Sequence, residues 1–537
     1  MMARLKILCF LLVTFLQVNE GTCQIWPRIY FPNTGTYPWG VTESYDHGFV
    51  IGGMYYSNQT YHWGLVFKTD INGEVLWHKK VGNYNDGTIV YDITQTDDGG
   101  YILTGGTCHY NEHFDPYFIK LDACGNPSWC RVYSTPDLDY IGKAINPVSD
   151  GYIAYVFRYG DDSIQPKLWL FKLDLNGDIV WKQSYAQSDT SITKEHCYTL
   201  HLSSDDYYII TGYCYYPDSI NGSTSYLKPL IIKADQNGNA EWELPWTNVD
   251  GELFYGQGFQ SVSSLRKTIY TGGRHIIPTG LYQGDKPSLL KTSGDGNEIE
   301  YSDLNQNSIL GLTSTIDWFA DSTLALGGSW LLAGGSTDNK VIKTDTNGNI
   351  LKIKEIITSY ETFQDGLVTF DNKLLLIVGI ATNLVRSYAW KLTSDLEYDT
   401  LYTQPFVYDS LCPHPITSDT IPLDCVIVGL EEPLQSPETG RLKVYPNPAW
   451  EILHIEIPEH LKTETSNPAF HITTIYHQWK SAMIEVYNLY GREMLAKDIR
   501  QADEEFLIDV SRWNAGMYVI RLVYQGQTIA SEKVMVN

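Results

Sequence analysis

Two short patterns of apolar and polar residues alternate along most of the chain. In the first, an apolar run ends in a lysine and a polar turn, as in FKTDINGEVLW at residues 67–77. In the second, a polar turn opens an apolar run, as in DDGGYILTGG at residues 97–106. Short runs bounded by Asp, Asn and Gly are typical of β-strands joined by tight turns. The pattern therefore predicts an all-β protein.

Both patterns recur seven times in register, and a lysine marks each copy. The lysines are Lys68, Lys120, Lys172, Lys233, Lys291, Lys343 and Lys391. They are separated by 52, 52, 61, 58, 52 and 48 residues. A period of this length, with room for about four strands per unit, indicates a propeller whose blades bury their faces against one another. We expect a seven-bladed β-propeller over residues 24–407.

Two segments compete to close the predicted ring. IWPRIYFP, at residues 25–32, has the apolar and aromatic residues of a strand and could be the outer strand of the last blade. EYDTLYTQPF, at residues 397–406, fits the same place. The sequence leaves both alternatives open.

Asn-Gly pairs stand at the turns of four repeats, at residues 72–73, 176–177, 237–238 and 347–348. They predict two-residue type I′ turns, and the aspartate two residues earlier is expected to accept main-chain hydrogen bonds. A tryptophan seven residues after the aspartate is predicted to pack between blades, as Trp77, Trp129, Trp181 and Trp242. The repeated lysine is predicted to snorkel or to cap a blade edge.

Two alternative hypotheses attach a ligand to these turns. Asp174, Asn176 and Asp178 alternate as oxygen donors, but an EF-hand type calcium loop needs further ligands and a glycine at its sixth position, where the repeat has glycine fourth. The blade edges also resemble those of quinoprotein propellers, yet no two cysteines are adjacent. WD40 and kelch repeats match less well. The turn interpretation is favoured.

Composition supports strands and limits the partners. The chain holds 39 Tyr, 15 Trp and 17 Phe, and aromatic residues favour strands. Its 38 Lys and Arg against 63 Asp and Glu give a net charge of −25. Nucleic acids and anionic membrane surfaces bind clustered basic residues, so neither is an expected partner.

The N-terminus has the features of a secretory signal peptide over residues 1–23. Arg4 and Lys6 precede an apolar run from residue 7 to residue 16, which is too short to span a bilayer. A lipoprotein interpretation at Cys23 is weakened by the acidic Glu20. No other segment is long and apolar enough to predict a membrane span.

Export makes disulfides plausible. The chain has nine cysteines, and Cys9 and Cys23 are expected to leave with the signal peptide. Seven then remain, so at least one is expected outside an intramolecular pair. Cys197 and Cys214 lie symmetrically about the centre of a predicted hairpin and are predicted to pair across it. Cys412 and Cys425 flank a short polar loop and are predicted to form a second pair. Cys124 and Cys130 are too far apart along one strand to pair.

Motifs of catalysis and cofactor binding are missing from the sequence. There is no HExxH, no GxSxG, no phosphate-binding loop and no dinucleotide-binding glycine motif. His196 and His201 are five residues apart on one predicted strand and would point to opposite faces. HYNEHFD, at residues 109–115, offers metal-ligand types, but a solvated loop is the favoured interpretation. No catalytic residue, metal site or cofactor is predicted.

The chain changes character after the repeats. Residues 408–440 are polar and rich in proline, which predicts a linker. Residues 441–537 alternate short strands and turns over about the length of a small β-sandwich.

VYPNP, VYNLYGRE, IDVSRWNAGMYVIRL and the terminal EKVMVN resemble the type A C-terminal sorting domain of the type IX secretion system of Bacteroidetes. The resemblance implies passage through both membranes and recognition by the type IX machinery. It implies a sorting function for Tyr445, Pro446, Asn447, Pro448, Gly491, Gly516, Tyr518 and Lys533.

These features together predict a secreted or cell-surface binding protein that reaches its destination through the periplasm. A rigid ring with long loops, many Tyr residues and no catalytic motif favours an adhesin or a glycan or protein binder. The alternative is an extracellular polysaccharide-acting enzyme with its site on one face of the propeller. A structural surface-layer component is a third hypothesis.

Overall fold

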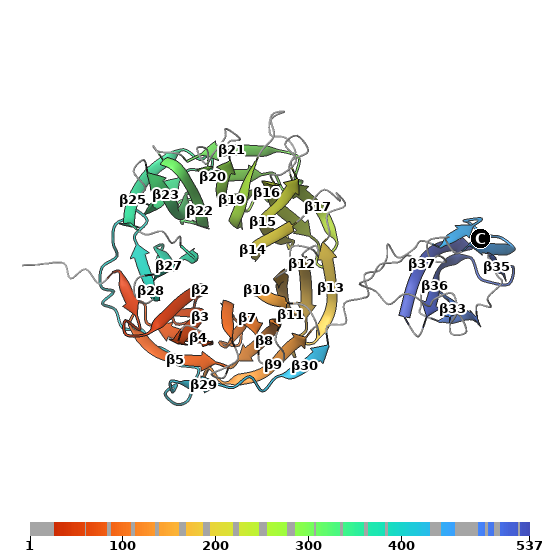
Figure 1. The fold of residues 1–537 in the computed structure, drawn as a ribbon, viewed down its shortest axis with the longest axis horizontal. Helices are drawn as coiled ribbons and strands as arrows, with labels where there is room; N and C mark the ends of the chain where they lie inside the picture. Colours follow the sequence, from red (N-terminus) through yellow and green to blue (C-terminus); the bar gives the residue numbers. More distant parts are fainter. Residues whose placement is uncertain are drawn as a thin grey trace, which may run out of the picture. The chain divides into compact units, whose positions relative to one another are not determined.

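The computed structural model describes residues 26–429 and 442–536, except for short segments within both ranges (Figure 1). The segments left out are residues 59–60, 83–86, 109–112, 135–138, 160–167, 186–193, 218–224, 246–254, 277–284, 305–307, 333–336, 359–362, 382–384, 457–481, 489–491, 499–504 and 525–526. Every element assigned in the described residues is a β-strand. The chain divides into two compact units, Met1–Leu430 and Glu431–Asn537.

In the described residues of the first unit, seven sheets stand side by side around a central axis (Figure 1). The innermost strands are β2 (Gly35–Glu43), β6 (Ile89–Gln95), β10 (Asp139–Val148), β14 (Lys194–Leu202), β18 (Tyr255–Ser263), β22 (Ser308–Trp318) and β26 (Asp365–Val368). The second strands are β3 (Phe49–Asn58), β7 (Tyr101–Thr107), β11 (Gly151–Tyr159), β15 (Tyr208–Pro217), β19 (Ile269–Ile276), β23 (Leu324–Leu332) and β27 (Leu374–Ala381).

The outer half of each sheet completes the blade. The third strands are β4 (Tyr61–Thr69), β8 (Asp115–Leu121), β12 (Leu168–Leu173), β16 (Ser225–Ala234), β20 (Asp285–Thr292), β24 (Thr337–Thr344) and β28 (Val385–Leu392). The outermost are β5 (Val75–Val81), β9 (Pro127–Ser134), β13 (Ile179–Tyr185), β17 (Ala240–Pro245), β21 (Ile299–Asp303), β25 (Ile350–Thr358) and, in the last sheet, β1 (Arg28–Tyr30). The predicted all-β propeller is confirmed.

The N-terminal strand closes the ring. β1 pairs antiparallel with β28, so that Arg28 lies opposite Ala389 and Tyr30 opposite Ser387. The last sheet therefore joins the first strand of the described chain to the seventh repeat. This decides between the two segments that competed for the place.

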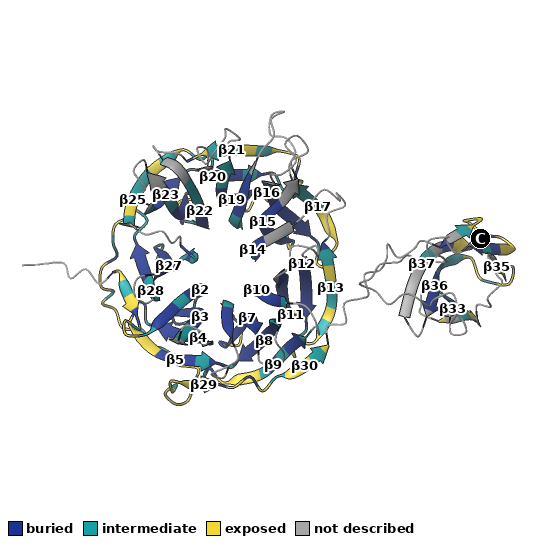
Figure 2. Ribbon diagram, viewed as in Figure 1, coloured by how far each residue is buried: buried dark blue, intermediate teal, exposed yellow. Residues whose placement is uncertain are grey.

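Neighbouring sheets bury each other's faces. In β8 all seven residues are buried, because sheets cover it on both sides, whereas β13 alternates intermediate and exposed residues on the rim (Figure 2). The apolar clusters accordingly cross from one sheet to the next. One of them combines Tyr155 and Leu170 of the third sheet with Ile210 and Ile232 of the fourth. This burial is the driving force that holds the ring together.

The turn between the third and fourth strands differs from the predicted type. Glycine alone has positive φ, as at Gly73 (φ 79°) and Gly177 (φ 83°), whereas a type I′ turn needs two such residues. Gly73 N–H donates to Asp70 O at 3.0 Å, and Asp70 N–H donates to Glu74 O at 2.8 Å across the turn. The turn is therefore type I followed by a left-handed glycine that makes a bulge.

The residues that repeat at this turn have a structural role. Asp174 Oδ1 accepts the N–H groups of Asn176 at 2.8 Å and Asp178 at 2.9 Å, as the sequence predicted. Trp129 donates its indole N–H to Leu175 O at 2.8 Å and packs on Gly177 in the next sheet. The prediction that these tryptophans pack between blades is confirmed.

Each marker lysine but one binds an aspartate in the turn between the first two strands of its own sheet. The pairs are Lys68–Asp46, Lys120–Asp98, Lys172–Asp150, Lys233–Asp205, Lys343–Asp321 and Lys391–Asp371. In the fifth sheet Arg266 occupies the turn position of the aspartate, and Lys291 binds Glu300 instead at 2.7 Å. The repeated lysine is thus an ion-pairing residue that ties a turn to the third strand of its sheet.

The segment predicted as a linker is instead partly built into the propeller. Residues 407–429, which we call the strap, contain β29 (Asp419–Ile421) and β30 (Val426–Gly429). β29 pairs in parallel with β5, and β30 with β9, so each covers the open edge of an outermost strand. These strands have only three and four residues, too few to show a strand pattern in a proline-rich segment, which is why the prediction failed.

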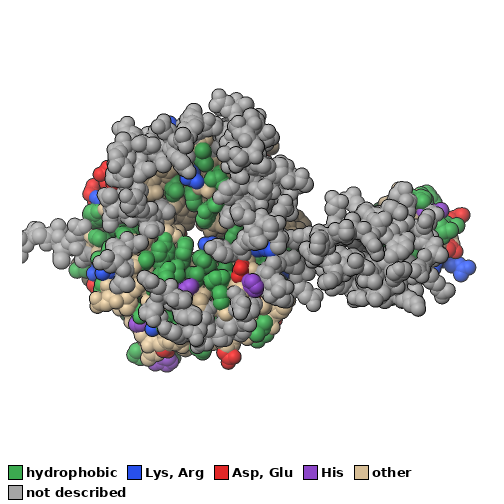
Figure 3. Space-filling view, in the orientation of Figure 1, with side chains coloured by type: hydrophobic (Ala, Val, Ile, Leu, Met, Phe, Trp, Pro, Cys, Tyr) green, Lys and Arg blue, Asp and Glu red, His purple; other side chains and the backbone are tan. Residues whose placement is uncertain are grey.

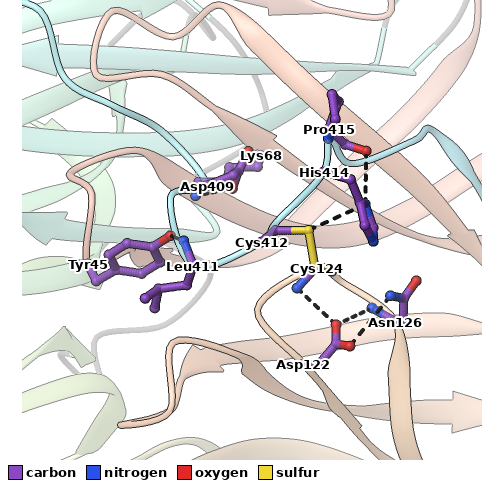
Figure 4. Close-up of a disulfide and its surroundings, with 10 residues drawn as sticks. All are labelled: Tyr45, Lys68, Asp122, Cys124, Asn126, Asp409, Leu411, Cys412, His414 and Pro415. Atoms are coloured by element: carbon purple, nitrogen blue, oxygen red, sulfur yellow. Dashed lines mark hydrogen bonds and ion pairs between the residues drawn. A yellow bond between two sulfur atoms is a disulfide. The ribbon is translucent and has the colours of Figure 1, made fainter.

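Two disulfides fasten the strap to the second sheet. One joins Cys124 to Cys412, with Cα atoms 5.0 Å apart (Figure 4). The other joins Cys130 to Cys425, with Cα atoms 4.5 Å apart. The predicted Cys412–Cys425 pair is therefore wrong, because both cysteines reach partners about 290 residues earlier in the chain.

The predicted bridge between Cys197 and Cys214 is also wrong. The hairpin turns about Asp205, and a bulge between Cys197 and Thr199 shifts the register further. Cys197 then lies opposite Gly212, and Cys214 lies opposite Glu195. Diagonal neighbours in a sheet are roughly 7–8 Å apart, which is too far for a disulfide. Cys214 donates its thiol hydrogen to Lys228 O instead, at 3.7 Å.

The second unit is the predicted small β-sandwich. One sheet has the order β31 (Lys443–Tyr445), β32 (Ile452–Glu456), β35 (Glu505–Asp509). The other has the order β34 (Glu493–Asp498), β33 (Ala482–Asn488), β36 (Gly516–Tyr524), β37 (Gln527–Val536). Ile455 and Ile508 of the first sheet share one buried core with Val486 and Ile520 of the second.

Candidate functional site

The two ends of the ring differ in their connections. Because each sheet is antiparallel, the turns after its first and third strands lie at one end, and these are the tight turns described above. The connections at the other end vary in length, from two residues between β3 and β4 to nine between β17 and β18, and many of their residues lie outside the described part. His109 and Glu112 of the HYNEHFD segment are among them. The described residues that line the centre of the ring therefore define the candidate site.

The innermost strands share an irregularity that the sequence analysis missed. Six of them carry a β-bulge in which one or two extra residues face a continuous second strand. At the position that these strands share, the extra residues are Trp39, Tyr91, Lys143, Tyr198, Phe259, Gln260 and Ser314. β22 has a second register shift between Ser308 and Leu310. We call the side chains of Trp39, Tyr91, Lys143, Tyr198 and Phe259 the bulge ring.

The glycines opposite the bulges explain the repeated Gly-Gly motif. A Cβ added at Gly105 would lie 1.8 Å from Ile89 O, and one at Gly328 would lie 2.0 Å from Leu312 O. The bulged inner strand thus approaches the second strand so closely that only glycine fits. The double glycine in a strand was the available sequence clue to these bulges.

Bulge-ring residues of neighbouring sheets contact each other. The rings of Trp39 and Tyr91 have centroids 5.2 Å apart, and those of Tyr198 and Phe259 4.9 Å apart. Lys143 Nζ lies 4.0 Å from the Tyr91 centroid and 4.9 Å from the Trp39 centroid. Three consecutive sheets therefore contribute to one aromatic and cationic cluster.

This cluster lies in the inner wall of the ring. The space-filling view shows hydrophobic side chains around a hollow at the centre of the propeller, with Lys or Arg side chains beside it (Figure 3). Four of the five bulge-ring residues are half-buried, and Tyr198 is 37% exposed. Burial lowers the pKa of Lys143 to about 8. The hollow thus combines flat apolar surfaces with one desolvated amine.

Two aspartates behind the bulge ring connect neighbouring innermost strands. Asp92 accepts the N–H of Ile93 and the N–H of Ile145 in the next sheet, both at 2.8 Å. Asp365 accepts the N–H of Val41 in the first sheet at 2.9 Å and its neighbour Gly366 N–H at 2.8 Å. All four carboxylate oxygens are therefore used to join backbone segments.

Gln260 extends this set of polar links across the sixth sheet. Its Nε2 donates to Asp365 Oδ1 at 3.2 Å, and its Oε1 accepts the N–H of Ile316 at 2.9 Å. Asp317 in turn accepts Val368 N–H at 2.6 Å. These side chains fix the spacing of the innermost strands around the hollow.

Burial shifts the titration of these groups. It raises the pKa of Asp92 to about 6, although the hydrogen bonds from the main-chain N–H groups of Ile145 and Ile93 lower that pKa. It raises the pKa of Asp365 to about 7, opposed by the Val41 N–H and assisted by the charge of Asp92. It lowers the pKa of His201 to about 4, and the ring of this histidine lies 2.7 Å from Ser263 Oγ. Asp92 and Asp365 therefore titrate near neutral pH.

A group of metal-ligand types occurs at the strap. Cys124, Cys412 and His414 bring their ligand atoms within 4.8 Å of one another (Figure 4). The two sulfurs are bonded to each other, and a disulfide sulfur is not the thiolate that binds metals. This group is a disulfide with a neighbouring histidine.

The predicted sorting residues lie in the sandwich. The first part of the motif joins the two ends of the domain, because Asn447 Oδ1 accepts Met535 N–H at 2.9 Å. Tyr445 stacks on His454 with centroids 5.0 Å apart, and Pro446 and Pro448 follow cis peptide bonds.

The remaining sorting residues lie later in the domain. Tyr518 is buried and donates its hydroxyl to Asn514 O at 2.7 Å, and Gly516 begins β36. Lys533 lies opposite Val519 in β37. Gly491 lies outside the described residues.

Residues 443–537 match the family model described as a secretion system C-terminal sorting domain. The second unit is thus a type IX sorting domain, which indicates export to the cell surface or beyond and contact with the secretion machinery. Within the described ranges, the structure contains no helix with the length and apolarity needed to cross a membrane.

Several solved structures resemble the propeller at low sequence identity. A protein of unknown function from Dyadobacter fermentans is 8% identical, with a TM-score of 0.38, covering 68% of this chain and 96% of its own. The β-propeller domain of the Trilobed protease from Pyrococcus furiosus is 12% identical, with a TM-score of 0.39, covering 69% and 96%.

The WD40 domain of Toxoplasma gondii coronin is 6% identical, with a TM-score of 0.37, covering 70% of this chain and 88% of its own. No curated protein matches the chain. Likenesses at this level do not bear on the chemistry of the site.

Proposed function

We propose that this protein is an exported binding protein, an adhesin or a glycan or protein binder, whose ligand enters the hollow lined by the bulge ring. The signal peptide at residues 1–23 would take it across the inner membrane, and the sorting domain across the outer one. The observation that carries the proposal is that bulged residues of four innermost strands form two aromatic pairs, Trp39 with Tyr91 and Tyr198 with Phe259.

Aromatic faces with a few polar groups are the usual lining of small-molecule and sugar sites. The scaffold beneath them is rigid, because the inner strands are joined by hydrogen bonds from Asp92, Gln260, Asp317 and Asp365. A preorganised surface loses little conformational entropy when it binds. The arrangement therefore suits recognition of a ligand end that reaches into the ring.

A glycan array and a panel of surface proteins, probed with residues 24–537, test the proposal. We expect a defined set of glycans or proteins to bind, and Tyr198→Ala to weaken that binding. Trp450→Ala is the matched control, since Trp450 is 67% exposed but belongs to the sorting domain. Binding unaffected by Tyr198→Ala, or lost equally in the control, would count against the bulge ring.

A second candidate is a polysaccharide-acting enzyme, favoured by the raised pKa values of Asp92 and Asp365. Paired carboxyl groups of unequal pKa are the usual acid and base of glycoside cleavage. Against this, each carboxylate oxygen already accepts a main-chain N–H. Release of reducing ends from a substrate panel, abolished by Asp365→Asn, would favour the enzyme.

We also propose that the motif residues of the sandwich form the sorting signal. These are Tyr445, Pro446, Asn447, Pro448, Gly491, Gly516, Tyr518 and Lys533. Asn447→Ala removes the acceptor of Met535 N–H and is expected to leave more protein in the periplasm. Trp450→Ala, at an exposed neighbouring position, should be exported normally.

A further inference from the structure

We propose that the cluster of Lys143, Trp39 and Tyr91 binds a single anionic group on the terminal sugar of an oligosaccharide. The inference rests on the proposed binding function and specifies the class of its ligand. It identifies Lys143 as the residue that selects acidic over neutral sugars.

Lys143 differs from the marker lysines in its surroundings. Six marker lysines bind an aspartate in their own sheet, as Lys68 does Asp46 at 2.6 Å. Among the described residues, the contacts of Lys143 are the faces of Tyr91 and Trp39. No carboxylate of the described residues pairs with its ammonium to offset the desolvation, and a buried cation gains most from an added counter-ion. The site is therefore prepared for an anion.

A second unfilled donor lies beside it. Trp39 Nε1 is buried and has no hydrogen-bond acceptor among the described residues. A buried indole N–H normally finds an acceptor. A carboxylate or sulfate has at least two acceptor oxygens, so one group can serve both the Lys143 ammonium and the Trp39 N–H.

The aromatic rings supply the surface for the rest of the sugar. Trp39 and Tyr91 lie with their centroids 5.2 Å apart, and Tyr37 extends the group with its centroid 4.9 Å from that of Trp39. Such faces pack against the C–H groups of a pyranose ring. The cluster thus pairs an apolar platform with a point charge.

The charge of the whole protein limits the ligand to one anion. With a net charge of −25, the protein repels a long polyanion, whereas a single charge at a chain end experiences mainly the local cation. Lys143 stands in the bulge of the innermost strand β10, and we infer that a chain end enters there. We therefore expect binding to terminal acidic sugars and not to the interior of acidic polymers.

Calorimetric titration of residues 24–537 with three trisaccharides tests this. One ends in glucuronate, one in a 6-sulfated glucose and one in glucose. An acidic end should bind at least tenfold more tightly than glucose, and the two acidic arms show which anion is preferred. Lys143→Met should reduce acidic binding about 10–100-fold, and Lys143→Arg should restore much of it.

Lys80→Met is the matched control. Lys80 Nζ lies 4.3 Å from the Tyr55 centroid and 4.6 Å from the Trp63 centroid, but on an outermost strand. It should leave binding unchanged. Trp39→Phe keeps an aromatic ring but removes the N–H, so it should weaken binding of the two acidic trisaccharides more than binding of the glucose one. This variant tests the site even if Lys143→Met misfolds.

The outcomes separate the two proposals. Equal binding of all three trisaccharides, weakened by Tyr198→Ala but not by Lys143→Met, would overturn the anion site and leave the binding function standing. An equal loss of affinity for the acidic trisaccharides in Lys80→Met and Lys143→Met would also overturn the anion site. If no sugar or protein binds at all, both proposals fail.

Discussion

The ammonium of Lys68 lies 2.6 Å from the carboxylate of Asp46, and both side chains are buried. Burial raises the pKa of Asp46, but the hydrogen bond from Lys68 and its charge outweigh this and hold that pKa below its usual value. Asp409 of the strap binds the same ammonium at 2.6 Å. One lysine thus joins a turn, a strand and the strap.

Lys68→Met should destabilise the propeller by about 3–5 kcal/mol, because it leaves a buried carboxylate without its partner. The matched change, Lys291→Met, breaks a more exposed pair with Glu300 and should cost less than about 1 kcal/mol. Urea unfolding of both variants measures the difference. Equal losses would mean that the burial of the Lys68 pair has no energetic consequence.

Peptide mapping under non-reducing conditions should find Cys124 linked to Cys412 and Cys130 linked to Cys425. Replacing either pair with serine should lower stability by about 2–5 kcal/mol, since each bond closes a long loop. It should also make the strap more sensitive to proteases. Recovery of a Cys412–Cys425 peptide would contradict this arrangement.

Gly105→Ala should destabilise the second sheet by about 1–3 kcal/mol or more, because the new methyl group would lie 1.8 Å from Ile89 O. Gly429→Ala is the control, since nothing lies within 4 Å of its added Cβ. Thermal unfolding of both variants gives the comparison. Wild-type stability in Gly105→Ala would show that the bulged strand can move aside.

Asp365 should make the stability of the propeller depend on pH. Its folded pKa is raised from 3.8 to about 7, so between these values the folded protein holds a proton that the unfolded chain has released. Stability from this group is therefore present at low pH and lost as pH rises towards 7. Asp365→Asn removes this titrating group. The free energy of unfolding of the variant minus that of the wild type should therefore increase from pH 5 to pH 8.

Asp295→Asn provides the control for this experiment. Hydrogen bonds from Ser293 and Asn297 lower the pKa of Asp295 to about 2, so its contribution changes only below about pH 4. Its stability relative to wild type should stay constant from pH 5 to pH 8. A constant difference for Asp365→Asn as well would show that its carboxyl group is ionised throughout this range.

Features that depend on neighbours in the sequence were predicted well. The aspartate of each turn lies two residues from the amide it binds, so Asp174 and Asn176 were recognisable together. The tryptophan repeats at a fixed distance from that turn, and repetition itself implies a stack of similar units. The predicted turn type was wrong because only the glycine of each Asn-Gly pair has a positive φ. The pair by itself does not specify whether the asparagine has one as well.

Features that depend on strand register were not predictable. The turn centred on Asp205 and one bulge placed Cys197 opposite Gly212 and not Cys214. Similar bulges placed Lys143 against Tyr91 and Trp39. The marker lysines drew attention in the sequence because they repeat, yet all seven form ion pairs within their own sheets. Lys143 does not repeat, and for this reason no pattern marked it.

The sequence by itself determined the repeated strands, the propeller and the sorting domain, because these follow from local patterning, a regular period and contiguous motifs. Only the tertiary structure decided which strand closes the ring, which cysteines pair and which side chains line the hollow. Those outcomes depend on residues hundreds of positions apart being brought together, and on one-residue shifts in register that local preferences do not encode.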